Sequence, residues 1–244
     1  MDAVIQSMML KIRHAVLLLG LLFAPMVGAS QLVVQAKLYP ENVKYDVYRK
    51  GEQVGHYTLR FSEITGERVA ADIEMQLKAR VFGFFNFDYR YQAKEVWQND
   101  QLTLLNVTTV SNSKESRVSA VQKADFLEVI DKKGQLHSYP KELMTTHHWY
   151  RQLLDQKQVL NSITGKIDEI TPQLLGSALL DTNNQTVELE GYRLGGDLDR
   201  TVSWYDREGR WRALEFKAKD GSDIQVVWSG GRLIKETSLA QNKE

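Results

Sequence analysis

Residues 69–81 read VAADIEMQLKARV, a run in which apolar side chains return at every second position. A period of two is typical of a β-strand with one dry face and one wet face. Thirteen residues at a rise of about 3.3 Å each span roughly 43 Å, which exceeds the length of most strands in globular proteins. We therefore expect this strand to bend or coil, as the strands of barrels and half-barrels do.

Residues 85–97 repeat the pattern. Most odd-numbered positions carry aromatic or small apolar side chains, whereas the positions between them are mostly polar or charged. Two long amphipathic strands in series predict an antiparallel hairpin that bends near Gly83. In this hairpin the odd-numbered side chains of both strands face the core.

Turn signals separate further β-rich segments, as expected for a meander of antiparallel strands. These signals are Lys50-Gly51, Thr65-Gly66-Glu67, Asn99-Asp100, Lys133-Gly134, Glu208-Gly209 and Asp220-Gly221. The expected strands are residues 43–49, 54–64, 69–81, 84–97, 102–110, 117–122, 125–130, 135–139, 187–195, 200–205, 211–218 and 223–228. The predicted fold is all-β: an antiparallel meander that forms a barrel or a strongly curved half-barrel, with one short helix.

The helix is expected over residues 148–154, with Thr145 or Thr146 as its N-cap. Residues 167–180 fit either a helix that starts at Thr171-Pro172 or a pair of strands, and we favour strands. The tail after about residue 233 lacks a long apolar run and is expected to fray.

Residues 1–29 have the three parts of a secretory signal peptide. Lys11 and Arg13 lead into an apolar run over residues 15–27, and small residues precede a cleavage site at Ser30. An apolar core of thirteen residues is short for a bilayer span. We predict export to the periplasm, with no transmembrane anchor after cleavage.

The mature chain, residues 30–244, has a length that suits a single β-rich domain. Translation from Met8 or Met9, instead of Met1, would give a shorter charged leader. The whole sequence holds 31 basic and 31 acidic side chains, and the mature part has a net charge of about −1. This balance argues against a nucleic-acid partner and against a polybasic membrane anchor. The absence of cysteine excludes disulfides and a lipoprotein anchor.

Two polar groups are candidates for a catalytic or metal site. Neighbours in a helix point in different directions, so His147-His148 does not form the spaced clamp that zinc prefers. Asp197 and Asp199 place two carboxylates on one loop, and such a pair can act as general acid and base in hydrolysis. We favour the interpretation that this loop is a polar turn between strands. The motifs of serine hydrolases, zinc proteases and P-loop proteins are absent. We predict no catalytic residue, no metal site and no cofactor.

Aromatic side chains gather at the predicted bend between the two long strands. Phe82 and Phe84 fall on the face opposite Phe85. This tip is either buried on both sides or presents aromatic groups to a ligand. Together with Trp149 and Tyr150 of the expected helix, these residues form the predicted ligand-binding set.

Three classes of function fit these features. We favour a periplasmic, non-catalytic binding or carrier protein for an apolar or amphipathic, lipid-like molecule, because such barrels enclose one small ligand. The alternative is an accessory protein of the cell envelope, with a filled core and no small ligand. A hydrolase that uses a carboxylate pair ranks third. The expected partners are an apolar small molecule or lipid, or an envelope protein.

The order of several motifs resembles an uncharacterised family of exported proteobacterial proteins, domain of unknown function 6134. The matching residues are Tyr45-Asp46-Val47-Tyr48, Gly51, Val54-Gly55, the aromatic run 85–91, Glu95, Trp97, His148-Trp149, Leu160-Asn161, Thr164-Gly165, Tyr192-Arg193-Leu194, Gly196-Asp197-Leu198, Trp204-Tyr205-Asp206, Gly209 and Asp220-Gly221. Where the family usually shows an asparagine–proline pair after the tryptophan, this chain has Tyr150-Arg151. The resemblance implies a periplasmic, β-rich protein and brings no established activity.

Overall fold

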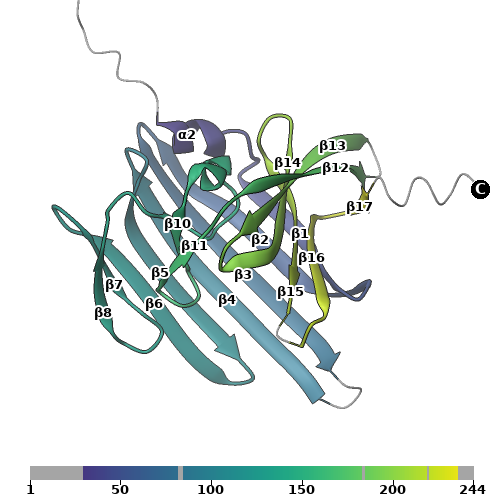
Figure 1. Cartoon of the computed structure of the whole chain (residues 1–244), viewed down its shortest axis with the longest axis horizontal. Helices are drawn as coiled ribbons and strands as arrows, with labels where there is room; N and C mark the ends of the chain where they lie inside the picture. The colour runs from purple at the N-terminus through teal and green to yellow at the C-terminus, as the bar shows by residue number, and fades with distance from the viewer. Residues whose placement is uncertain (1–29, 82–84, 183–184, 219, 236–244) are drawn as a thin grey trace, which may run out of the picture.

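The computed structural model describes residues 30–81, 85–182, 185–218 and 220–235 (Figure 1). The predicted leader, the two aromatic residues Phe82 and Phe84, and the last nine residues lie outside these ranges. Among the described residues, no helix has the length and apolar character needed to cross a bilayer.

Most of the described chain is antiparallel sheet, as the alternating patterns predict. The elements are α2 Gln31–Ala36, β1 Asn42–Arg49, β2 Glu52–Thr65, β3 Arg68–Val81, β4 Phe85–Gln98, β5 Gln101–Ser111, β6 Lys114–Gln122, β7 Leu127–Ile130, β8 Leu136–Tyr139, β9 Met144–Thr145, the 3₁₀ helix η1 Arg151–Asp155, β10 Gln158–Leu160, β11 Ile167–Glu169, β12 Gln173–Thr182, β13 Thr186–Gly195, β14 Leu198–Asp206, β15 Trp211–Lys217, β16 Asp223–Trp228 and β17 Gly231–Lys235. The segment with two possible readings is therefore strand, in β11 and β12.

Fourteen of these strands form one sheet in the order β17-β12-β13-β14-β15-β16-β1-β2-β3-β4-β5-β6-β7-β8. Strands β1 to β8 and β12 to β16 each pair in chain order, which confirms the meander. Within the described residues the sheet does not close, because β17 and β8 remain as its two ends. The predicted antiparallel, all-β fold is confirmed, and of its two forms, a barrel or a strongly curved half-barrel, the structure has the open one.

The long hairpin has the predicted register. β3 and β4 pair from Val69 opposite Trp97 to Val81 opposite Phe85. The odd-numbered side chains of β3 face the core, where Ile73 is fully buried.

The two faces of the C-terminal strands are both buried. On β14, Tyr205 points into the main core, whereas its neighbour Trp204 belongs to a second, smaller core. Val226 and Val227 on β16 divide in the same way. Because β17 follows β16 directly and yet pairs with β12, strands β12 to β17 roll up around the second core. This end of the sheet is curled more tightly than a simple half-barrel.

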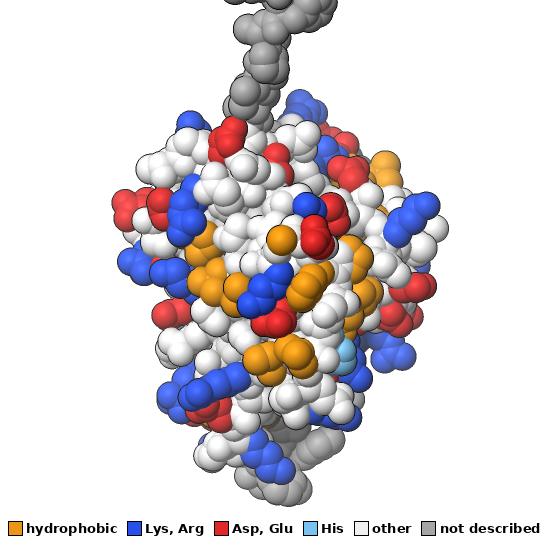
Figure 2. All heavy atoms as spheres, turned by 90° about the vertical axis from the view of Figure 1, so that its left-hand side faces the viewer, with side chains coloured by type: hydrophobic (Ala, Val, Ile, Leu, Met, Phe, Trp, Pro, Cys, Tyr) orange, Lys and Arg blue, Asp and Glu red, His pale blue; other side chains and the backbone are white. Residues whose placement is uncertain are grey.

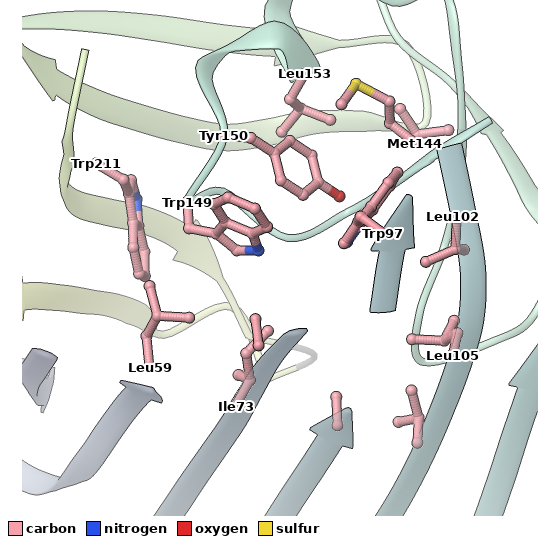
Figure 3. Close-up of a cluster of buried hydrophobic side chains, with 14 of the residues drawn as sticks. Leu59, Ile73, Trp97, Leu102, Leu105, Met144, Trp149, Tyr150, Leu153 and Trp211 are labelled. Carbon is pink, nitrogen blue, oxygen red and sulfur yellow. The ribbon is translucent and has the colours of Figure 1, made fainter. Parts of the chain in front are cut away.

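The main core lies between the sheet and the chain segment that links β8 to β12 (Figures 1 and 3). This segment carries the small sheet β11-β10-β9. It places Trp149, Tyr150 and Leu153 over the buried side chains of the large sheet, among them Ile73 and Leu105 (Figure 3). The sheet's dry face is therefore covered by an internal segment of the same chain.

The expected helix over residues 148–154 is wrong in type and start. The structure has the 3₁₀ helix η1, which begins at Arg151 after an N-cap, Tyr150, that makes no side-chain capping bond. The two threonines do not cap it because their hydroxyls are engaged elsewhere. Thr145 donates to Glu95, and Thr146 accepts the backbone N–H of Ser162.

The sequence did not predict α2, β17 or the short strands β9 and β10. Ser30 caps α2 by accepting the backbone N–H of Val33, and it donates to Asp100 at 2.5 Å. At the other end, β17 continues to Lys235, two residues past the expected start of the frayed tail. Its hydrogen bonds with β12 hold it in the sheet.

The register predicts a sharp difference between neighbouring substitutions on β3. Leu77 is 8% exposed and Gln76 is exposed. We expect Leu77→Lys to lower the free energy of unfolding by about 3 kcal/mol, because it places a charge in an apolar layer. Gln76→Lys should cost about 0.5 kcal/mol or less. Urea denaturation measures both, and equal midpoints would show that the register is wrong.

Candidate functional site

A cleft of about 560 Å³ opens between the sheet and its curled C-terminal end. Its floor is a row of side chains paired across three strands: Tyr57 on β2 lies opposite Met75 on β3, and Met75 lies opposite Tyr91 on β4. Phe216 on β15 and Val226 on β16 contribute to another wall. The cleft thus joins strands that are far apart in the chain.

Charged residues also line this cleft, and all of them are exposed. They are Asp197, Asp199, Arg200 and Lys217. Lys217 forms an ion pair with Asp223 at 2.5 Å. An apolar floor and wall combined with exposed charges suit a molecule that has both apolar and polar parts.

Glu95 lies on the core face of β4, in the same direction as Tyr91, and is completely buried. Four donors surround its carboxylate. They are the Thr145 hydroxyl at 2.5 Å, His147 Nδ1 at 2.6 Å, and the indole Nε1 atoms of Trp149 at 3.1 Å and Trp97 at 3.4 Å. We call these five residues the Glu95 cluster.

The donors keep Glu95 ionised. Burial raises the pKa of the carboxyl, but the charge and hydrogen bond of His147, with the hydrogen bonds from Thr145 and Trp149, outweigh it. The pKa of Glu95 therefore lies below its usual range. The cluster ties the segment before η1 to the middle of the large sheet.

A line of hydrogen bonds leads from the Glu95 cluster to the cleft. The Tyr91 hydroxyl lies 2.6 Å from Nε2 of His147 and donates to the Ser162 hydroxyl at 2.9 Å. Tyr91, His147 and Ser162 all line the cleft. Burial raises the pKa of Tyr91 well above its usual value, so the phenol keeps its proton. Because Tyr91 stands between histidine and serine, these contacts do not form a serine–histidine–carboxylate triad.

The two residues of the predicted ligand-binding set whose side chains the structure describes do not line this cleft. Trp149 and Tyr150 are fully buried in the main core and are not among the residues that line it. Their physical role is packing and hydrogen bonding, Trp149 to Glu95 and Tyr150 to Thr145. Phe85 begins β4, six residues before Tyr91 and so roughly 20 Å along the strand. Ligand contact at Phe85 stays a prediction, and Phe82 and Phe84 lie outside the described residues.

The aspartate pair and the histidine pair have structural contacts of their own. Asp197 accepts the backbone N–H of Glu169 at 2.9 Å and donates its own N–H to the carbonyl of the same residue. Asp197 thereby anchors the turn between β13 and β14 to β11. Both aspartates are exposed. The two histidines diverge, since His147 contacts Glu95 and His148 stacks on Trp211. In the described part of the chain, no group of three or more His, Asp or Glu residues is placed to hold a metal ion.

Sequence reasoning missed the floor of the cleft and the role of Glu95. A signal for Glu95 was present, because it is a charged residue on the otherwise dry face of a strongly alternating strand. A carboxylate at such a position requires buried donors. Those donors, Thr145 and His147, are fifty residues away in the chain, so periodicity alone does not identify them.

Among solved structures, the chain resembles a β-barrel-like protein of the domain of unknown function DUF1849 from Brucella abortus. The two share 12% sequence identity with a TM-score of 0.55, over 79% of this chain and 96% of the other. This likeness concerns the fold. A DUF1329 family protein from Desulfovibrio piger ATCC 29098 aligns at 10% identity over 84% of this chain and 90% of the other, with a TM-score of 0.16. A comparison with curated proteins finds no match. The model of the domain of unknown function DUF6134 matches residues 45–235, and the chain belongs to that family.

Proposed function

We propose that this chain is a non-catalytic binding or carrier protein for an apolar or amphipathic molecule, exported to the periplasm. The observation that carries the proposal is the cleft floored by Tyr57, Met75 and Tyr91. Its volume falls within the range of small-molecule sites, roughly 300–1,000 Å³. The fold, a curved sheet that is β-barrel-like, is one that accommodates such a site.

The energetics of an acyl chain are sufficient for binding. Each buried methylene contributes about 0.8 kcal/mol, so ten would contribute roughly 8 kcal/mol before the costs of ordering. A dissociation constant in the micromolar range corresponds to about that free energy.

Export is supported by the leader pattern of the sequence. Cleavage before Ser30 would leave the described contacts of that residue within the mature chain, namely the cap of α2 and the bond to Asp100.

The alternative is an accessory protein whose surface binds an envelope partner. Its supporting observation is a set of exposed apolar side chains near the β8 end of the sheet, Val121, Ile130 and Leu136. Figure 2 shows this side of the molecule, where hydrophobic side chains are interspersed with charged ones. Such mixing is weaker support than the cleft, because interaction sites usually present a continuous apolar patch.

Titration with the uncharged fluorescent dye N-phenyl-1-naphthylamine tests the proposal. We expect saturable binding to the mature chain at micromolar concentration. Phe216→Glu, which puts a charge on the apolar wall, should weaken binding by about tenfold or more. Leu136→Glu is the matched control, because Leu136 is 63% exposed and does not line the cleft. Absence of saturable binding to the unaltered protein would contradict the binding function and favour the accessory-protein function.

A further inference from the structure

Two residues that line the cleft each hold a buried side-chain atom that has no hydrogen-bond partner among the described residues. These atoms are the indole Nε1 of Trp211 and Nδ1 of His148. Trp211 itself is 0% exposed. The backbone N–H of Trp211 donates to the Tyr39 hydroxyl, and its backbone carbonyl accepts a hydrogen bond from the Tyr45 hydroxyl. The indole N–H is thus a single unmet donor, and buried donors are rarely left unmet in a native protein.

The rings around Trp211 hold its indole in place. Tyr45 lies on it at a centroid distance of 4.3 Å, and His148 stacks at 5.6 Å with an interplanar angle of 23°. Tyr57 meets the ring edge-on at 5.2 Å. An indole packed by three rings cannot turn to find another acceptor without disrupting this packing.

The charges nearby disfavour an anion at this point. The ionised carboxylate of Glu95 lies on the same face of β4 as Tyr91 of the floor, and His147 already faces it at 2.6 Å. Burial, with a smaller contribution from His147, lowers the pKa of His148 to about 3, so this ring is neutral at pH 7. The cleft cations are the exposed Arg200 and Lys217, the second already paired with Asp223.

We propose that the ligand is an uncharged amphiphile, such as an acyl ester, whose polar group accepts a hydrogen bond from Trp211 Nε1 beside the His148 ring. This inference rests on the proposed binding function and specifies the chemical class of the ligand. The apolar part of the ligand lies along Met75 and Phe216, which line the same cleft.

Competition against the bound dye tests the ligand class. The two competitors are 1-oleoylglycerol and ionised oleate, each used at pH 8 and below its aggregation concentration. The measurement is how well each displaces N-phenyl-1-naphthylamine from the full mature chain. The two compounds share one acyl chain and differ in the charge of the polar group. We expect 1-oleoylglycerol to bind about tenfold more tightly, because the carboxylate would lose its hydration without gaining a buried cation.

A variant tests the donor. In Trp211→Phe, which keeps an aromatic ring but lacks the N–H, the preference for 1-oleoylglycerol over oleate should fall to about onefold. If circular dichroism shows that this variant does not fold, the unaltered protein is titrated with 1-octadecene, which keeps an apolar chain but offers no acceptor. It should displace the dye about tenfold less well than 1-oleoylglycerol, and equal displacement would overturn the hydrogen bond. Leu136→Ser should keep the preference of the unaltered protein.

The outcomes separate the two proposals. Dye binding combined with an equal or tighter affinity for oleate overturns the uncharged ligand and leaves the binding function standing, with the exposed Arg200 as the candidate anion partner. A preference unchanged in folded Trp211→Phe overturns the assigned donor. Failure of the dye to bind the unaltered protein overturns the binding function itself.

Discussion

Glu95→Ala is expected to lower the free energy of unfolding by about 3–5 kcal/mol, because it removes the acceptor shared by four buried donors. The imidazole of His147 and the indoles of Trp97 and Trp149 would then be left without their carboxylate partner in the core. The loss should appear in chemical denaturation as a lower midpoint. Glu74→Ala, which removes an exposed carboxylate from β3, is the control and should change stability by about 0.5 kcal/mol or less.

The stability of Glu95→Gln, measured against pH, tests whether the charge of Glu95 causes its stabilising effect. The folded-state pKa of Glu95 lies below its usual value of 4.5. Its contribution is therefore fully present above about pH 4.5 and is lost as the pH falls through the folded pKa. The stability difference between the unaltered protein and Glu95→Gln should shrink between pH 5 and pH 3. A difference that stays constant over this range would mean that Glu95 stabilises by shape alone. His148 is present in both proteins, so its own titration cancels.

Asp206→Ala is the second substitution with a large expected effect, also about 3–5 kcal/mol. The Asp206 carboxylate accepts hydrogen bonds from the backbone N–H groups of Glu208 and Arg210. It also accepts hydrogen bonds from the Nε atoms of Arg210 and Arg212, and both of these distances are 2.7 Å. The Arg212 side chain is 6% exposed and lies 4.0 Å above the ring of Trp228. Without Asp206, a buried guanidinium loses its counter-charge at the junction of the two cores.

An exposed ion pair on the sheet provides the comparison for Asp206. Asp72 pairs with Arg60 at 3.0 Å, and the Arg60 side chain is 56% exposed. Asp72→Ala should cost less than about 1 kcal/mol, because solvent screens this pair. Thermal melts of the two variants at equal ionic strength make the comparison. Similar melting temperatures would show that the Asp206 network contributes no more than a surface pair.

The strands were predictable because their signal is local. Alternation over residues 69–81 and 85–97 is a property of neighbouring side chains, and it correctly placed Ile73 and Trp97 in the core. Turn residues likewise act over a few positions, as at Gly51, whose φ of +83° between β1 and β2 suits glycine. Chain-order pairing of β1 to β8 followed from the short loops.

The helix before β10 shows how tertiary contacts override a local signal. A threonine ahead of an apolar run normally caps a helix, but here the Thr145 hydroxyl is bound to Glu95. Trp149 lies in the core close by, where its indole donates to the same carboxylate. Trp149 therefore packs in the core, and the ligand contact that its position in the sequence suggested stays a prediction.

The sequence by itself determined the class of fold, the long β3–β4 hairpin and the face that each of these strands turns inward, since all three follow from periodicity within one segment. Only the tertiary structure decided that β16 pairs with β1, that β17 pairs with β12, and that Tyr91, Phe216 and Trp211 line one cleft. The β1–β16 pairing and the cleft join segments that are separated by more than a hundred residues, and the β12–β17 pairing joins segments about fifty residues apart. Their choice depends on which apolar faces and buried polar groups remain unmet after local structure has formed, and no short window of sequence contains that information.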